Sequence, residues 1–153
     1  MLNNMVRINN ECYVSLEVAK LLKEAGFDWK CNGVFISEDG TQYTFIKMDA
    51  AWDSNNSKYN QYNISAPTLD VAQRWLREVK GIYVESVLCV NRRTTGHSFG
   101  FSIEEVSADL STVKILYPST YFDEEETKGF IKYELSLVVG IKKALEIILE
   151  KGE

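Results

Sequence analysis

Apolar residues recur at helical spacing in three segments of the chain, and each segment has its own start or stop signal. The first segment follows Ser15, whose hydroxyl can accept a hydrogen bond from a free amide of the first turn. Gly26 comes directly after the segment, at a position where a left-handed backbone favours glycine. The apolar stripe of this predicted helix consists of Val18, Leu21, Leu22 and Ala25.

The second segment predicts a helix between the cap residue Thr68 and the stop residue Gly81. Asp70 lies in its first turn, where a carboxylate interacts favourably with the helix dipole. Its polar side carries Arg74 and Arg77. The stripe predicted to be buried consists of Ala72, Trp75, Leu76 and Val79.

The third predicted helix, from about Tyr133 to Lys151, is the longest. It is apolar over more than half of its circumference, because Leu135, Val138 and Val139 lie off its main stripe. A helix of this kind is buried on several sides. Two alternatives follow: a central place in the fold, or a homodimer contact through this C-terminal helix. The main stripe consists of Leu137, Ile141, Ala144, Leu145 and Ile148.

Between the first two helices the apolar pattern changes to the period of two that is typical of strands. Residues 31–48 predict a hairpin around Asp39 and Gly40, because Asp-Gly is a strong signal for a tight hairpin turn. Residues 49–63 predict a long polar loop that is unusually rich in aromatic residues.

A second predicted hairpin follows the second helix. Its strands are residues 82–90 and about 98–104, joined by the polar turn 91–96. Residues 113–117 are a further candidate strand whose presence the sequence leaves open. If it forms, its period of two places Val113, Ile115 and Tyr117 on one face.

This order of elements predicts an α+β fold. We expect an antiparallel sheet of two hairpins, with about four or five strands, and about three helices that lie mainly on one face. A chain of 153 residues with 45% hydrophobic content is long enough for one buried core, so we expect a single domain over residues 1–153.

Charge and cysteine content narrow the function classes. A formal net charge of −5 lacks the positive field that supplies most non-specific affinity for nucleic acid. No apolar stretch has the length of a signal peptide core at the N-terminus or of a membrane span elsewhere. An odd number of cysteines, Cys12, Cys31 and Cys89, suits a reducing compartment. We therefore expect a cytoplasmic protein without a membrane partner.

Three blocks of the sequence resemble a known group of proteins. They are VSLEVAKLLKEAGFDW, SAPTLDVAQRWLREVKGIYV and YELSLVVGIKKALEIILEK, in that order. The sequence is similar to small uncharacterised prophage and mobile-element proteins of gut Bacteroidales, which join three such helices through variable strands. The last block departs from the group's usual polar pattern at Leu135, Leu137, Val138 and Val139. The resemblance implies an origin but no activity and no functional residues.

Residues with catalytic or metal-binding chemistry are sparse. His97 is the only histidine, and a Cys89–His97 dyad across the second hairpin lacks the third group that would orient it. The acidic run from Asp123 to Glu126 does not alternate its carboxylates as a calcium loop does, so a solvated loop is the favoured interpretation. We predict no catalytic residue, no cofactor and no metal site.

A candidate interaction surface combines aromatic residues of the 49–63 loop with arginines of the second helix and the following turn. Aromatic residues are enriched at binding sites but also pack under loops, and packing is the more frequent case. The surface consists of Trp52, Tyr59, Tyr62, Arg74, Arg77, Arg92 and Arg93.

The favoured hypothesis is a phage- or mobile-element-associated accessory protein that acts as a non-enzymatic protein-interaction module with an unknown protein partner. Nucleic-acid binding through the arginine strip or the exposed face of the sheet is the alternative. An enzyme of unknown type is the least favoured.

Overall fold

The computed structural model describes residues 5–49, 55–58, 61–90, 97–117 and 133–152, with the backbone alone at residues 89–90 and 97–98. The α+β prediction is confirmed. The strands are more numerous than predicted: the described residues form three helices and eight strands. The helices are α1 (Leu16–Glu24), α2 (Leu69–Lys80) and α3 (Tyr133–Lys151). The strands are β1 (Met5–Ile8), β2 (Glu11–Val14), β3 (Gly33–Ile36), β4 (Thr44–Lys47), β5 (Ile64–Ser65), β6 (Ile82–Val90), β7 (His97–Val106) and β8 (Val113–Tyr117).

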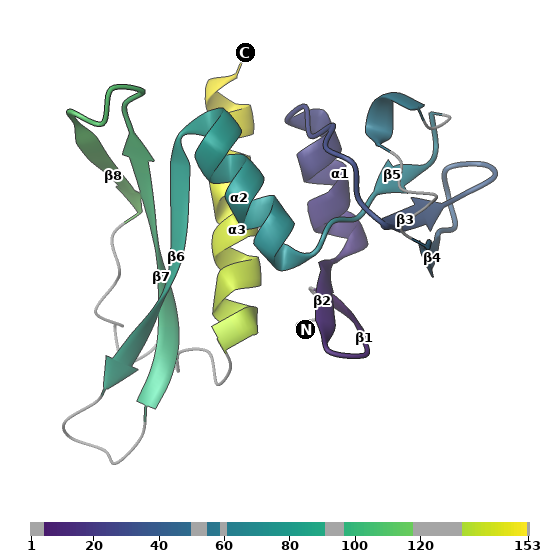
Figure 1. Cartoon of the computed structure of the whole chain (residues 1–153), viewed down its shortest axis with the longest axis horizontal. Helices are drawn as coiled ribbons and strands as arrows, with labels where there is room; N and C mark the ends of the chain where they lie inside the picture. Colours follow the sequence, from purple (N-terminus) through teal and green to yellow (C-terminus); the bar gives the residue numbers. More distant parts are fainter. Residues whose placement is uncertain (1–4, 50–54, 59–60, 91–96, 118–132, 153) are drawn as a thin grey trace.

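The helices lie between two three-stranded antiparallel sheets, and β1 and β2 form a separate two-stranded sheet (Figure 1). One sheet has the strand order β4-β3-β5 and the other has the order β6-β7-β8. The two predicted hairpins therefore exist, but they do not join into one sheet. The hairpin formed by residues 82–106 is long and pairs along its whole length, from Ile82 opposite Glu105 to Val90 opposite His97.

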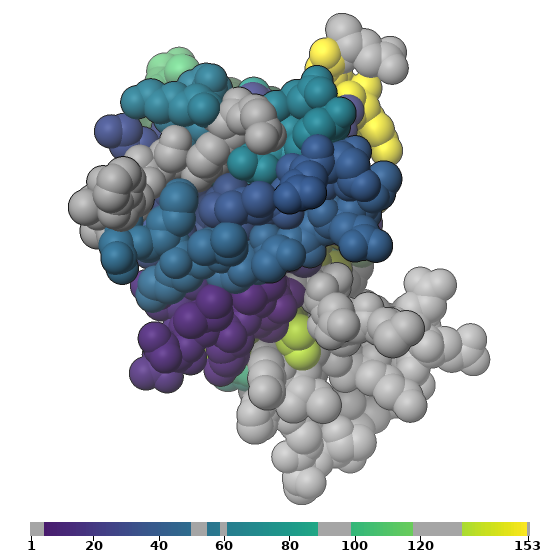
Figure 2. Space-filling model, turned by 90° about the vertical axis from the view of Figure 1, so that its right-hand side faces the viewer, coloured from purple at the N-terminus to yellow at the C-terminus, as the bar shows by residue number. Residues whose placement is uncertain are grey.

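The N-terminal hairpin of β1 and β2 was not predicted. Its two-residue turn, Asn9 and Asn10, joins Ile8 to Glu11, and Asn9 has a φ of 56°. Asparagine tolerates this left-handed conformation better than most residues do, which is why it suits such a turn. In Figure 2 this hairpin (purple) lies directly beside the β4-β3-β5 sheet (blue).

The turn between β3 and β4 is wider than the sequence predicts. The register pairs Ile36 with Thr44, so residues 37–43 connect the strands instead of Asp39 and Gly40 alone. Asp39 organises this turn by accepting hydrogen bonds from the amide of Thr41, at 2.9 Å, and from its hydroxyl, at 2.8 Å. Asp-Gly thus marks the turn correctly, but side-chain hydrogen bonding makes it longer.

Helices α1 and α2 begin and end where their signals predict. Ser15 Oγ accepts a hydrogen bond from the Val18 amide at 3.2 Å, and Gly81 ends α2 with a φ of 67°. Thr68 occupies the N-cap position of α2, but its side chain makes no capping hydrogen bond. The predicted buried stripe of α2 holds for three of its four residues. The prediction that Val79 is buried is wrong, because this residue is 50% exposed.

Helix α3 occupies the centre of the molecule. It packs on β6 and β7 along one side and against α1 and α2 on the other (Figure 1). These neighbours account for its wide apolar surface, so of the two alternatives for this helix the central position explains the pattern. The homodimer contact remains a prediction. No helix among the described residues is long and apolar enough to cross a membrane.

Gly140 sets how closely α3 approaches the sheet. A Cβ at this position would lie 2.8 Å from Val84 Cγ1 and 3.1 Å from Phe101 Cβ. Val84 is fully buried in β6, and its branched side chain has little rotamer freedom. The helix can therefore rest on this part of the sheet only because residue 140 has no side chain.

We expect Gly140→Ala to destabilise the protein by about 1–3 kcal/mol, because overpacking a tight contact outweighs the roughly 1 kcal/mol that alanine gains over glycine in a helix. Chemical denaturation followed by circular dichroism measures the free energy of unfolding. Glu150→Ala, at an exposed position of the same helix, is the control and should change stability by less than about 0.5 kcal/mol. A stabilised Gly140→Ala protein would contradict the tight contact.

The two helix caps differ in a testable way. Ser15→Ala removes a capping hydrogen bond and should cost about 1 kcal/mol. Thr68→Ala removes a hydroxyl that makes no such bond, so it should lower the free energy of unfolding by only a few tenths of a kcal/mol. The same denaturation experiment compares them, and equal losses would show that the Ser15 hydroxyl is not what caps α1.

Candidate functional site

The residues of the predicted interaction surface are only partly described. Trp52, Tyr59, Arg92 and Arg93 lie outside the described residues, and so does the acidic run from Asp123 to Glu126. Tyr62, Arg74 and Arg77 are described.

Arg74 is occupied by contacts within its own region. Its guanidinium carbon lies 5.0 Å from the centre of the Trp29 ring, and its Nε lies 3.5 Å from Glu78 Oε1, one turn further along α2. The carboxylate of Glu78 balances the positive charge of Arg74 locally, although an exposed pair of this kind adds little stability. Arg77 is only half-exposed. The described part of the arginine strip is therefore weaker as a positive surface than the sequence suggests.

Tyr62 packs at the β3–β4 turn. Its ring lies 3.0 Å from the position that a Cβ of Gly40 would take. The chain on both sides is held by Lys23, whose Nζ donates hydrogen bonds to the carbonyls of Gln61 and Asn63, each at 3.1 Å. The contacts in the structure thus place Tyr62 beside Gly40 and Arg74 beside Trp29, and they favour a packing role for Tyr62.

The most exposed apolar side chains lie elsewhere, in the hairpin of β7 and β8. Leu110 is 72% exposed, Ile115 63% and Val113 59%, and these are the highest values among the large apolar residues described. We call these three residues the hairpin patch. Leu110 also has a φ of 60°, a left-handed conformation that leucine adopts only at a cost of about 1 kcal/mol or more. Large exposed apolar groups gathered in one place typically mark an interaction site.

The strand register defines on which side of the β6-β7-β8 sheet Val113 and Ile115 lie. Val84 pairs with Ile103, and both are fully buried against the helices. Side chains alternate along a strand, so residues out of step with these two lie on the opposite side. We call that side the outer face. On it lie Tyr83, Glu85, Val87, Ser102, Glu104, Val106, Val113 and Ile115.

A register shift between Ile103 and Glu104 corrects the expected face of β8. Tyr117 pairs with Ile103, whereas Ile115 pairs with Glu104. Tyr117 therefore lies on the helix side, where its ring stacks on Phe101 at 4.9 Å, and Val113 and Ile115 lie on the outer face. The prediction that all three residues share a face is wrong, because one residue of β8 is left over in the pairing.

A cavity of about 320 Å³ lies between the β1–β2 hairpin and the beginnings of α2 and α3. The carboxylates of Glu11 and Glu134 at its rim are already paired, with Lys47 and with Arg7. The hydrogen bond from Lys47 also lowers the pKa of Glu11, which keeps this carboxyl ionised. The lining residues are Asn10, Glu11, Cys12, Thr68, Leu69, Asp70, Tyr133, Glu134 and Leu137.

The Cys89–His97 dyad gains no support from the backbone. The register pairs Cys89 with Ser98 and His97 with Val90, so the two residues are not directly opposite each other. Within the part of the chain that the structure describes, no group of three or more His, Cys, Asp or Glu residues is placed to hold a metal ion.

Comparison with protein-family models, with curated proteins and with solved structures finds no match to this chain. The class of protein therefore rests on the fold and the surface alone. It is an α+β protein that exposes Val113 and Ile115 on the sheet face opposite its described helices.

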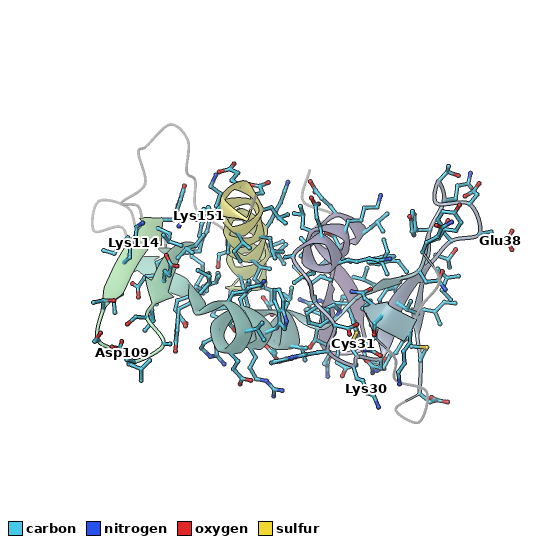
Figure 3. The ribbon with its side chains drawn as sticks, turned by 90° about the horizontal axis from the view of Figure 1, so that it is seen from above. Lys30, Cys31, Glu38, Asp109, Lys114 and Lys151 are labelled. Carbon is cyan, nitrogen blue, oxygen red and sulfur yellow. The ribbon has the colours of Figure 1, made fainter. Side chains whose placement is uncertain are left out.

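The turn that carries Leu110 depends on the ionised carboxylate of Asp109. Its Oδ1 accepts hydrogen bonds from Ser107 Oγ at 2.7 Å, from the Ser111 amide at 3.0 Å and from Ser111 Oγ at 2.6 Å. These bonds lower the pKa of Asp109 to about 2. The turn that carries Leu110 is thus held by a charged group at the exposed end of the hairpin (Figure 3).

A carboxyl group whose pKa is lower in the folded state stabilises that state above its unfolded pKa, near 4, and loses this contribution as the pH falls toward about 2. We expect the Asp109 carboxyl carbon to titrate by NMR with a midpoint of about 2, and the Ser111 amide to shift with the same midpoint. In Asp109→Asn this titration of the Ser111 amide should vanish. A midpoint near the ordinary value of an aspartate would mean that the turn does not depend on these bonds.

Proposed function

We propose that this protein is a non-enzymatic protein-interaction module that binds its partner through the hairpin patch. The observation that carries the proposal is the clustering of the three most exposed large apolar residues described, Leu110, Val113 and Ile115, within one hairpin. Removing apolar surface from water contributes about 25 cal/mol per Å², so a partner that covers these side chains gains affinity directly.

The backbone of the patch supports the same proposal. Leucine at a left-handed position costs free energy that glycine or asparagine would avoid, and the Leu110 side chain is largely in solvent, so packing within the chain offers little compensation. Such an outlier is the kind of feature that a functional requirement explains. Contact with a partner is a requirement that would favour leucine here.

Binding fits the described geometry better than catalysis does. Two of the three carboxylates that line the cavity beside α2 and α3, those of Glu11 and Glu134, are already paired with cations, and the lining residues contain no nucleophile with an adjacent base. The alternative of nucleic-acid binding has less support, because Arg74 is balanced by Glu78 and the outer face carries Glu85 and Glu104. Phosphate groups would be repelled by these carboxylates.

We further propose that the protein acts in the cytoplasm as an accessory protein of a phage or mobile element. The origin is supported by the sequence resemblance of its three helical blocks. A reducing compartment is consistent with Cys31, whose thiol donates a weak hydrogen bond to the Gly33 carbonyl at 3.5 Å, and with Cys12, which is a free thiol.

A selection of binders from a displayed peptide library tests the interaction role. We expect peptides selected on the wild-type protein to lose about tenfold or more of their affinity for the triple variant Leu110→Asn, Val113→Thr, Ile115→Thr. Asparagine suits a left-handed turn and threonine suits a strand, so the fold should persist. Calorimetry measures the dissociation constants.

Ile46→Thr is the matched control, because Ile46 is also an exposed strand isoleucine but lies in the β4-β3-β5 sheet. Its affinity for the selected peptides should equal that of the wild type. A library that gives no binders would overturn the proposed function. Binders whose affinity for the triple variant equals their affinity for Ile46→Thr would also overturn it.

A further inference from the structure

The outer face carries carboxylates as well as apolar groups. Glu85 is exposed and Glu104 is half-exposed, and neither forms an ion pair with any residue that the structure describes. The register places Glu104 beside Ile115 of β8 on one side and beside Tyr83 of β6 on the other. The apolar part of the face is thus interrupted by unpaired negative charge.

We propose that a basic amphipathic helix of the partner protein covers this outer face, with apolar residues on Val113 and Ile115 and lysine or arginine opposite Glu85 and Glu104. The inference rests on the proposed function and names the chemistry of the partner. Its support comes from the width of the face, from both edges of the sheet and from the charge.

The width of the face suits one helix. Neighbouring strands are about 4.8 Å apart, so three strands span roughly 10 Å, which is close to the diameter of an α-helix with its side chains. The inner face of the same sheet already shows this arrangement, because α3 packs there on β6 and β7. A helix on the outer face would complete a layer that the chain itself does not supply in its described part.

The edges of the sheet argue against the addition of a partner strand. At the β6 edge, Gln73 of α2 donates a hydrogen bond from Nε2 to the Val84 carbonyl at 2.6 Å. The Gly81 carbonyl accepts from the Val106 amide, so it points to β7, and the alternation of the strand turns the Val84 carbonyl to the open side. Gln73 therefore occupies a backbone group that an added strand would need.

The β8 edge carries two features that discourage strand addition. Lys114 is an exposed charge in the middle of this short strand, and the register shift beside Ile103 interrupts regular pairing. Lysine residues and irregular pairing are the usual means by which edge strands avoid further strands. Figure 3 shows Lys114 at the end of the molecule that is farthest from Glu38.

The charge argues against a second copy of this chain as the occupant. Two outer faces placed together would bring Glu85 and Glu104 of each copy near those of the other, in a protein whose net charge is −5. Like charges at an interface suppress association, whereas a positively charged partner is attracted and correctly oriented.

The test uses three fluorescent synthetic peptides. The first is a leucine/lysine peptide with helical spacing, the second is its leucine/glutamate counterpart, and the third has the composition of the first with strand-like alternation. Fluorescence anisotropy measures binding at low and high salt, and hydrogen exchange locates it. We expect the helical basic peptide to bind most tightly, to protect β6–β8 and to weaken with added salt.

Charge reversal supplies the decisive variant. The double variant Glu85→Lys, Glu104→Lys should bind the basic peptide about tenfold more weakly at low salt and should bind the acidic peptide more tightly than the basic one. The control is Glu24→Lys with Glu38→Lys, which changes the net charge equally at two exposed sites away from the outer face and should leave the order of peptides unchanged. Thermal melting checks that both variants fold.

Each other outcome overturns the inference in its own way. Tighter binding of the alternating peptide would indicate strand addition, and a wild-type dimer in light scattering that Ile115→Lys dissociates would indicate a second copy. An equal loss of affinity for the basic peptide in both double variants would show an unspecific charge effect. Tighter binding of a single-stranded oligonucleotide than of the basic peptide would indicate a nucleic-acid partner. If the displayed-library binders still require the hairpin patch, the proposed function survives these failures.

Discussion

The structure depends on the close approach of α3 to the β6-β7-β8 sheet. Gly140 allows this approach, because any side chain there would collide with Val84 and Phe101. The same helix contacts α1 and α2 on its other side, so it joins the large sheet to the rest of the core. Hydrogen bonds also fix the start of α3 on β6. The hydroxyls of Ser86 and Ser136 share one, and the Ser136 hydroxyl donates another to the Tyr133 carbonyl. The position of the sheet is therefore set by one helix on one face.

One-sided packing has a consequence for the outer face. A sheet packed on one side normally has polar residues on the other, and β7 follows this rule with Ser102 and Glu104. Strand β8 breaks the rule with Val113 and Ile115, which are more than half exposed. Less than half of each of these side chains is covered by its own chain. The most exposed apolar residues of the outer face thus lie in the strand farthest from the helices.

The sequence predicts local structure well because caps, stripes and glycine stops act within a few residues of each other. Ser15, Thr68 and Gly81 therefore mark helix boundaries correctly. The arrangement of hairpins into two sheets depends on contacts between distant segments, such as β5 pairing with β3, and no local pattern contains that information. The β1–β2 hairpin was not predicted, although its Asn-Asn turn gives a local signal.

The same limit applies to the candidate site. The sequence directs attention to aromatic residues and arginines, because these types are frequent at interfaces. Among the described members, Tyr62 and Arg74 instead make contacts inside the chain. The exposure of Val113 and Ile115 could not be predicted, because it follows from the register shift and from the helices covering only the other face. Apolar alternation in β8 predicts a strand but not which side is left uncovered.

The carboxylates of the outer face act against self-association through this face. Glu85 and Glu104 lack described counter-ions, so copies of the protein that approach through this face repel one another. An exposed pair of charges adds little to affinity when a partner arrives, whereas desolvation of Val113 and Ile115 adds more. In the proposed complex, affinity and selectivity would be carried by different side chains of the same three strands. The apolar residues would determine how strongly a helix binds, and the two glutamates would determine which helices are preferred.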